Sequence, residues 1–155
     1  MHSANGALEG GYGVGRAVSL KWAGDGWAVG GPLACGATNA NSNAVAVSLF
    51  TFSASSFSGF ALAATLGSGY TGGKNVNVAL DSSDGFGSAV SLNAAGDRLA
   101  VGAPFDGGAT NANSNSGAVS LFTFSAETLS GFALASTVGW GSTCGQNTNA
   151  QRDGG

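Results

Sequence analysis

Charged residues are scarce in this chain. Asp, Glu, Lys and Arg together make up 8% of its 155 residues, against about a quarter in a typical soluble domain. Such a chain stays in solution through neutral hydrogen-bonding groups, a balance commoner in extracellular and cell-surface repeat proteins than in cytosolic enzymes. Its five basic residues are scattered and its net charge is −3. It therefore has no basic patch to neutralise phosphates, which argues against nucleic acid as a partner.

Residue types that serve nucleophilic catalysis or bind zinc are also few. The one histidine, His2, stands close to the N-terminus, so no Ser-His-Asp or Cys-His arrangement is expected. The two cysteines, Cys35 and Cys144, have no partners at the spacing of a zinc site. They either form a single disulfide or remain two independent thiols, and the sequence leaves both readings open.

Long apolar runs are missing as well. No stretch approaches the roughly 18–20 apolar residues of a membrane helix. Residues 1–11 (MHSANGALEGG) lack the basic start and apolar run of a signal peptide. Neither a membrane span nor a signal peptide is therefore visible in the sequence.

What the chain does contain is an internal repeat of 72 residues. Residues 12–83 align without a gap with residues 84–155, and 44 of the 72 positions are identical. A period of this length indicates one supersecondary unit built twice. Residues 1–11 partly match the end of the first copy, so we expect them to be the tail of a preceding repeat. The chain is then either part of a longer array, which we favour, or a permuted repeat whose ends complete each other.

Each copy is predicted to hold four short antiparallel strands. In the second copy, Phe86–Leu92 and a strand that begins at Arg98 flank a Gly-Asp turn, which describes a hairpin. After a polar loop over 106–117, residues 118–124 (AVSLFTF) carry apolar side chains on both faces. Two apolar faces imply cover on both sides of the strand. The fourth strand begins at Phe132.

The strand pattern favours one architecture. No segment has the apolar spacing of an amphipathic helix, and NVNVAL from Asn75 predicts a short fifth strand. A four-stranded meander with two apolar faces has to stack on copies of itself, as propeller blades do. The predicted fold is all-β, with tandem four-stranded antiparallel blades of β-propeller type in a partial propeller of two blades plus the tail of a third. A β-solenoid is the competing architecture, but its coils repeat at roughly 20–30 residues.

Two short signatures in the second copy point to a family. Phe86-Gly87 and Gly102-Ala103-Pro104 stand in the order and spacing of the FG-GAP repeat, which this chain resembles. The first copy carries weaker forms, GVG at 13–15 and GGP at 30–32. The resemblance implies blades like those of the integrin α-subunit propeller and of many bacterial secreted proteins. It also implies an extracellular or cell-surface location.

Many members of this family carry a calcium loop in the hairpin between the first two strands. The corresponding hairpins here keep one carboxylate each, Asp25 and Asp97, whereas calcium takes about six to eight oxygen ligands. These residues are interpreted as turn residues that bond backbone amides, and no cofactor is expected. A looser calcium site is the weaker alternative, around Asp81, Ser83 and Asp84, or around Asp106 with Asn111, Asn113 and Asn115.

Ligand contact is assigned to loops and to aromatic residues outside the repeat pattern. Trp140 and Tyr70 have no aromatic equivalents after the 72-residue shift, so they are candidates for contact with a glycan or protein. Trp27, by contrast, is expected to pack across a junction between blades, and for Trp140 this role is as open as ligand contact. The loops over 33–43 and 105–115 are expected to form one rim. Their candidate residues are Asn39, Asn41, Asn43, Asn111, Asn113 and Asn115.

Three functions are compatible with these patterns. The first is a non-catalytic module for adhesion or for protein or glycan binding through the rim loops. The second is a structural spacer, whose partners are neighbouring repeats, because the loop sequence GATNANSN is identical in both copies. The third is a glycosidase-like enzyme fragment with a carboxylate pair, for which the sequence contains no supporting motif.

Overall fold

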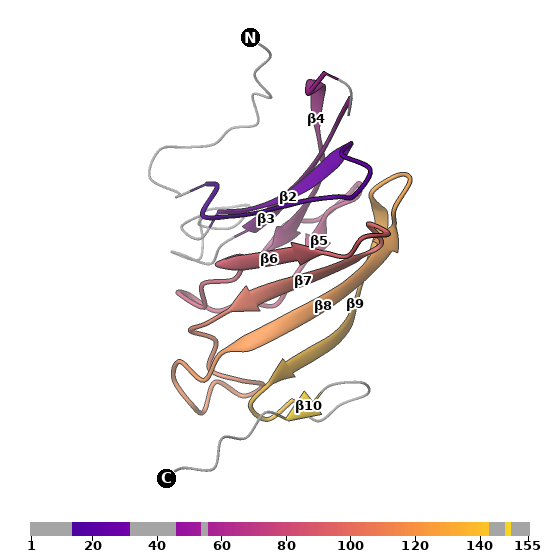
Figure 1. Ribbon diagram of the computed structural model, residues 1–155. Helices are drawn as coiled ribbons and strands as arrows, with labels where there is room; N and C mark the ends of the chain where they lie inside the picture. The colour runs from indigo at the N-terminus through magenta and orange to yellow at the C-terminus, as the bar shows by residue number, and fades with distance from the viewer. Residues whose placement is uncertain (1–13, 32–45, 54–55, 143–147, 150–155) are drawn as a thin grey trace.

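The computed structural model describes residues 14–31, 46–53, 56–142 and 148–149, which form strands, turns and loops and contain no helix. They build two sheets of five strands each (Figure 1). The first sheet consists of β1 (Ala17–Leu20), β2 (Gly26–Gly31), β3 (Ala46–Ser53), β4 (Ser58–Gly67) and β5 (Val76–Asn77). The second consists of β6 (Ala89–Leu92), β7 (Arg98–Ala103), β8 (Ala118–Ser125), β9 (Ser130–Gly139) and β10 (Thr148–Asn149).

The second sheet repeats the first at a shift of 72 residues in every strand boundary. In both sheets neighbouring strands follow chain order. Both also contain the same break in register, at Leu49/Phe50 in the first sheet and at Leu121/Phe122 in the second. The predicted all-β fold with tandem antiparallel blades is therefore confirmed. Residues 1–11, predicted to be the tail of another repeat, lie outside the described residues, and the division of the chain at 12–83 and 84–155 stays a prediction.

The first strand of the second copy is shorter than the sequence predicts. It begins at Ala89 instead of Phe86. Gly85 and Gly87, on either side of Phe86, adopt left-handed backbone angles with φ of 70° and 85°. An extended strand cannot pass through such angles, so the Phe-Gly signature forms a turn that leads into β6.

The predicted fifth strand is present as β5, and it runs parallel to β4. Leu66 of β4 faces Val76 of β5. The side-chain oxygen of Asn75, just before β5, accepts a 2.9 Å hydrogen bond from the amide of Thr65. The chain that leaves β4 therefore turns back and is held along the edge of its own sheet.

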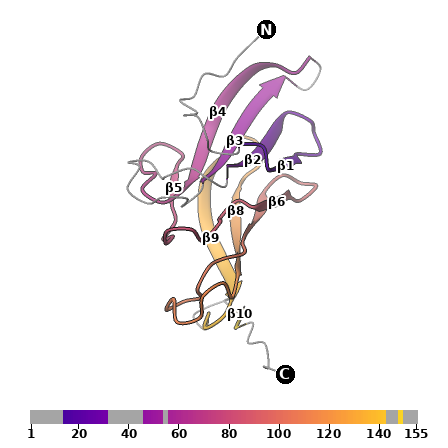
Figure 2. The same ribbon diagram turned by 90° about the vertical axis from the view of Figure 1, so that its left-hand side faces the viewer.

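The main hydrophobic core lies between the two sheets. Strand β6 lies against β1 and β2, so that the second sheet stacks on a face of the first (Figures 1 and 2). The first sheet contributes Ala28, Val47, Leu49, Ala64 and Leu66 to this core. The second sheet contributes Leu99, Val101, Phe122 and Phe124, and the turn before β6 adds Phe86. Each copy thus buries an apolar face against the other, as the blade architecture requires.

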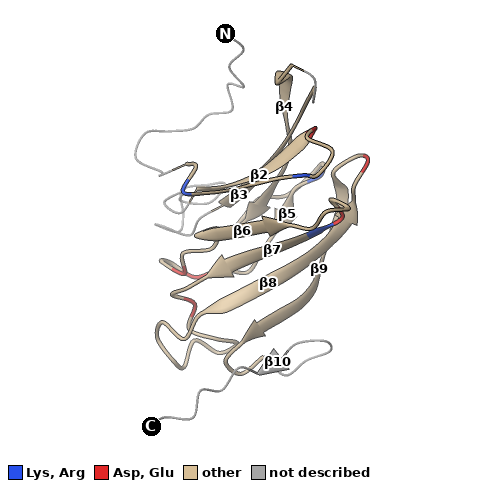
Figure 3. Cartoon of the chain, in the orientation of Figure 1, with Lys and Arg blue, Asp and Glu red and all other residues tan. Residues whose placement is uncertain are grey.

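Charged residues lie at turns and strand ends, and the strands between them contain almost none (Figure 3). The apolar and small side chains of the strands therefore dominate both faces of each sheet. Within the described ranges, no helix is long and apolar enough to cross a membrane.

Candidate functional site

The loop between β7 and β8 is fixed by its own backbone. The amide of Gly117 donates a 2.9 Å hydrogen bond to the carbonyl oxygen of Asp106, and the amide of Asn113 donates a 3.2 Å bond to the carbonyl oxygen of Gly107. The carboxylate of Asp106 accepts a 2.7 Å bond from the amide of Gly108. These bonds close the loop at its base and within its tip, so it projects from the sheet as an ordered structure.

The same loop is attached to two other segments. The amide of Ala109 donates a 3.0 Å hydrogen bond to the carbonyl oxygen of Trp140, just after β9, and the amide of Phe105 donates a 3.1 Å bond to that of Asp84. The loop is therefore hydrogen-bonded both to the end of β9 and to the segment that leads into β6.

Asparagine suits this loop for a backbone reason. Asn111 and Asn115 adopt left-handed angles with φ of 55° and 58°, which asparagine tolerates better than most residues. This agrees with the turn-forming role that the sequence predicts for the loop.

The two oxygen-rich clusters that the sequence presents as alternatives are neighbours in the structure. The side-chain amide of Asn111 donates a hydrogen bond to the carboxylate of Asp81, and the charges of Asp81 and Asp106 both act on Asp84. The structure thus gathers four predicted residues at one end of the second sheet. Ser83 lies between Asp81 and Asp84 with a left-handed φ of 74°.

Asp84 is the buried member of this group, with 5% of its surface exposed. Burial raises the pKa of its carboxyl group above 3.8, and the nearby charges of Asp106 and Asp81 act in the same direction. Its Oδ2 accepts a 2.7 Å hydrogen bond from the amide of Asp81, and this bond opposes the rise in pKa.

A groove of about 750 Å³ opens beside these carboxylates. One side is formed by β5 and the segment that follows it, with Val76, Val78 and Leu80, and the other by the second sheet, with Phe122 and Leu134. Asp81, Asp84, Asp106 and Asn111 contribute polar groups to its lining. Polar and apolar groups line this groove in about equal measure, and its volume falls within the roughly 300 to 1,000 Å³ of ligand sites.

The other predicted contact residues are less closely placed. Trp140 is half-buried, and its neighbours Gly141 and Ser142 line the groove. Tyr70, half-buried in the loop after β4, is not part of the groove lining. Asn113 and Asn115 lie in the β7–β8 loop, outside the groove lining. Asn39, Asn41, Asn43, Cys35 and Cys144 lie outside the described residues.

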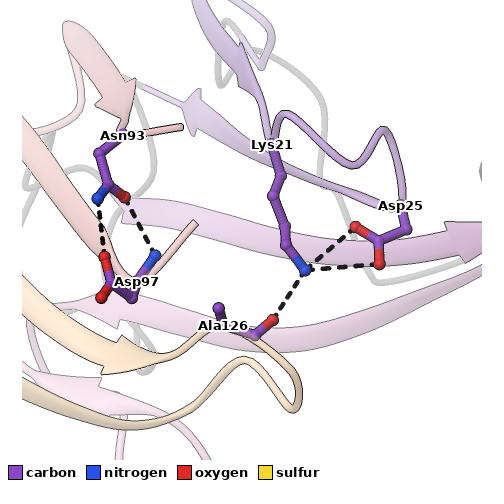
Figure 4. A network of polar contacts seen from close by, with 5 residues as sticks. All are labelled: Lys21, Asp25, Asn93, Asp97 and Ala126. Atoms are coloured by element: carbon purple, nitrogen blue, oxygen red, sulfur yellow. Dashed lines mark hydrogen bonds and ion pairs between the residues drawn. The ribbon is translucent and has the colours of Figure 1, made fainter. Parts of the chain in front are cut away.

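The hairpin aspartates bond side chains instead of the backbone amides predicted for them. The carboxylate of Asp97 accepts a 2.7 Å hydrogen bond from the side-chain amide of Asn93, whose oxygen accepts a 3.1 Å bond from the amide of Asp97 (Figure 4). Asp25 forms an ion pair of 3.2 Å with Lys21. In the described part of the chain, no three His, Cys, Asp or Glu side chains are grouped so that they could hold a metal ion. The weaker calcium hypothesis at Asp81, Asp84 and Asp106 stays a prediction.

The comparison with protein families concerns the segment that carries the carboxylates. Residues 80–122 match the FG-GAP repeat. The match contains both signatures, Phe86-Gly87 and Gly102-Ala103-Pro104, and confirms the resemblance for this part of the chain. The FG-GAP segment also contains the β7–β8 loop with Asp106 and Asn111. No curated protein matches the chain.

Two lysines that join the sheets were not identified from the sequence. Lys21 donates a 2.9 Å hydrogen bond through Nζ to the carbonyl oxygen of Ala126, and Lys74 donates a 2.6 Å bond to that of Thr128 (Figure 4 for Lys21). Both accepting carbonyls lie in the β8–β9 turn, just beyond the FG-GAP segment. The sequence did hold a signal, because the 72-residue shift places Asn93 opposite Lys21, which makes this lysine specific to the first copy.

Proposed function

We propose that the chain is a non-catalytic binding module of a secreted or cell-surface protein, which contacts a protein or glycan through the β7–β8 loop and the adjoining groove. The FG-GAP match supports a propeller-type repeat module. The observation that carries the proposal is that Asn111 of the loop and Asp81 of the preceding segment are hydrogen-bonded at the mouth of the groove.

The scaffold around this site is suited to recognition. The loop is bonded to itself, to Trp140 and to Asp84, so it loses little conformational freedom when a ligand binds. A preorganised loop on a sheet scaffold is a common arrangement for binding sites.

The chemistry of the site favours a neutral ligand rich in hydroxyl groups over a charged one. Amides, hydroxyls and carboxylates line the groove together with apolar side chains, and the strands near it contain almost no charged residues (Figure 3). Carboxylates and amides bond hydroxyl groups well, and the apolar wall suits the flat face of a sugar ring. A glycan is therefore the first ligand class to test, and a protein surface the second.

A catalytic function has less support. The raised pKa of Asp84 is a property that active-site acids share. Asp84 is, however, 5% exposed and bonded to the amide of Asp81, so its carboxylate serves the local fold. We infer a structural role for Asp84 and a non-catalytic role for the chain.

A spacer without a specific ligand is the second candidate. It is favoured by the loop sequence GATNANSN, which is the same at 36–43 and 108–115. A specific pocket in one copy would require the copies to differ. In the groove they do differ, because Asp84 and Asp106 have Tyr12 and Ala34 as their counterparts after the shift.

Binding assays on a glycan array and on immobilised extracellular-matrix proteins test the proposal. We expect saturable binding to one class, and at least about a tenfold weaker affinity for N111A, since one lost polar contact of about 1.4 kcal/mol has this effect. Glu127→Gln, in the turn at the opposite end of β8, is the control and should bind like the wild type. Absence of saturable binding on both surfaces, with a folded protein, would favour the spacer.

A further inference from the structure

Matched positions on the two sheets differ sharply in exposure. Val47 and Leu49 of β3 are fully buried, at 0%, because the second sheet covers them. Their counterparts on β8, Val119 and Leu121, are 39% and 37% exposed. The same apolar face is therefore covered in the first sheet and uncovered in the second.

The uncovered face of the second sheet is also hollowed. A depression of about 370 Å³ crosses its four antiparallel strands. Its floor includes Ser91, Ala100, Leu121 and Ser136, which face one another in register. The corresponding row in the first sheet is Ser19, Ala28, Leu49 and Ala64, and this row lies on the face on which the second sheet stacks. We call the row that begins at Ser91 the outer row.

Hydrogen-bonding groups of the junction between the sheets recur at the outer row. In the junction, the hydroxyl oxygen of Ser19 accepts a 2.9 Å hydrogen bond from the amide of Leu92. Ser91 has the place of Ser19 in the second sheet, and Leu20 has the place of Leu92 in the first. The hydroxyl of Ser91 on the second sheet is therefore equivalent to the acceptor in this bond, and the amide of Leu20 on the first sheet is equivalent to its donor.

Glycine gives a second and independent sign of a missing neighbour. At the junction, a Cβ on Gly30 would lie 2.0 Å from the carbonyl oxygen of Gly87, so only glycine permits this approach. The counterpart of Gly30 is Gly102, where a Cβ would meet only the side chain and backbone of Ala89, no closer than 3.4 Å. Inside this chain, alanine would fit at Gly102. The counterpart of Gly87 is Gly15, which has a similar φ of 91° and makes the same 3.0 Å bond to the strand beside it.

We propose that a second copy of this chain docks on the outer row, with its β1 placed as β6 is placed on the first sheet. Val18 and Leu20, 58% and 54% exposed on the face of the first sheet that points away from the junction, then lie against β6 and β7, as β6 lies against β1 and β2. The strands that follow β1 in the docked copy extend over Val119 and Leu121. The strands of both sheets contain almost no charged residues (Figure 3). Trp27, on this same outer face, contacts Phe50, Phe52 and Phe60 of its own sheet. In this arrangement Trp27 lies at the junction between copies and not at the junction within the chain.

The contact joins two different surfaces, so assembly is head-to-tail. Such contacts build closed rings or open filaments. Because propellers generally contain about four to eight blades, a closed ring of this chain, with two sheets per copy, holds about two to four copies. The contact is weaker than the internal junction, because Asn93 and Gln146 replace Lys21 and Lys74, whose hydrogen bonds reach the other sheet.

Sedimentation velocity of the 155-residue chain over a range of concentrations tests the proposal. The wild type should form species heavier than the monomer, and both L121D and L20D should remain monomeric. Their equimolar mixture should form a dimer and nothing larger, because it contains one intact pair of surfaces. Leu134→Asp is the matched control: Leu134 is 52% exposed and lies on the opposite face of the same sheet, so this variant should assemble like the wild type.

Gly102→Ala tests the contact without adding charge. It should retain the stability of the wild-type monomer and lose assembly, because the added Cβ meets the docked copy at its Gly15. A wild type that is monomeric at all concentrations, single variants that still assemble, or a mixture of L121D and L20D that gives no dimer would each overturn the proposal. Assembly of Gly102→Ala to the wild-type extent would overturn the placement of the second copy.

Discussion

The Nζ atom of Lys21 lies 2.9 Å from the carbonyl oxygen of Ala126, which is 105 residues further along the chain. Lys21 stands at the end of β1, and Ala126 in the β8–β9 turn of the other sheet, so the bond joins the two copies. The lysine side chain is 12% exposed, and it also pairs with Asp25 at 3.2 Å. Lys21 thus forms a hydrogen bond from a charged group at the edge of an otherwise apolar junction.

Lys21→Met keeps most of the apolar stem of the side chain and removes the ammonium group. The variant should lose about 1.5–3 kcal/mol of unfolding free energy, because a hydrogen bond to a charged group in a mostly buried place has this value. Urea denaturation measures the loss. Lys74→Met is the comparison: its bond to Thr128 is exposed, so the loss should be smaller. Equal losses of unfolding free energy in the two variants would contradict the expectation that burial strengthens the Lys21 hydrogen bond.

Gly30→Ala should be strongly destabilising. Its Cβ would lie 2.0 Å from the carbonyl oxygen of Gly87, so the sheets would have to move apart, at a cost of about 2–3 kcal/mol or more. Thermal unfolding followed by circular dichroism would show a lower Tm than for Gly102→Ala. If both variants melt at the same temperature, the close approach of Gly30 to Gly87 is not a feature of the junction.

Asp84→Asn should change how stability depends on pH. Because the folded-state pKa of Asp84 lies above its ordinary value of 3.8, its ionisation opposes folding, and the wild type loses unfolding free energy as pH rises through the raised pKa. Asparagine keeps an oxygen for the amide of Asp81 and carries no charge. The variant should be at least as stable as the wild type at about pH 7, and lose that advantage below the ordinary pKa. Urea denaturation across this range is the measurement, and a variant less stable at neutral pH would refute the assignment.

Gly108→Ala should loosen the β7–β8 loop. A Cβ there would lie 2.5 Å from the carbonyl oxygen of Trp140, which accepts the hydrogen bond that anchors the loop. Hydrogen exchange of amides 105–117 should become faster. Gly117→Ala is the control, because Gly117 lies in the same loop with a similar positive φ of 77°, against 81° for Gly108, but a Cβ there would approach no atom closer than 3.4 Å. Backbone strain is then common to both variants, and a faster loop in Gly108→Ala alone identifies the contact with Trp140.

The sequence predicts those parts of the fold that depend on local pattern and on the repeat. Strand β8 and the opposite facing of Val119 and Phe122 follow from alternation, and the stacking of the copies follows from two apolar faces. The parallel direction of β5 could not be derived, because a strand of two residues carries no signal of direction. The start of β6 was misplaced because the residue names do not reveal the left-handed angles of Gly85 and Gly87.

Individual residues of the candidate site were predicted from the sequence, but their proximity to one another was not. Asp81 and Asn111 were singled out in separate clusters, and only the fold brings them together across 30 residues. The groove walls were not foreseen, because Val76 and Val78 were interpreted only as a strand. Such contacts depend on the angle between sheets, which is set by packing along the whole junction.

The pairing of β5 with β4 affects how readily the protein aggregates at high concentration. Unpaired strand edges recruit other strands and start amyloid-like growth. Here β5 pairs with the edge of β4 at Leu66 and Gly67. Beside it, the side-chain oxygens of Asn75 and Asn77 accept hydrogen bonds from the backbone amides of Thr65 and Gly69. This end of β4 is therefore closed to the addition of another strand, and loss of the Asn75 or Asn77 side chain should expose it to such pairing.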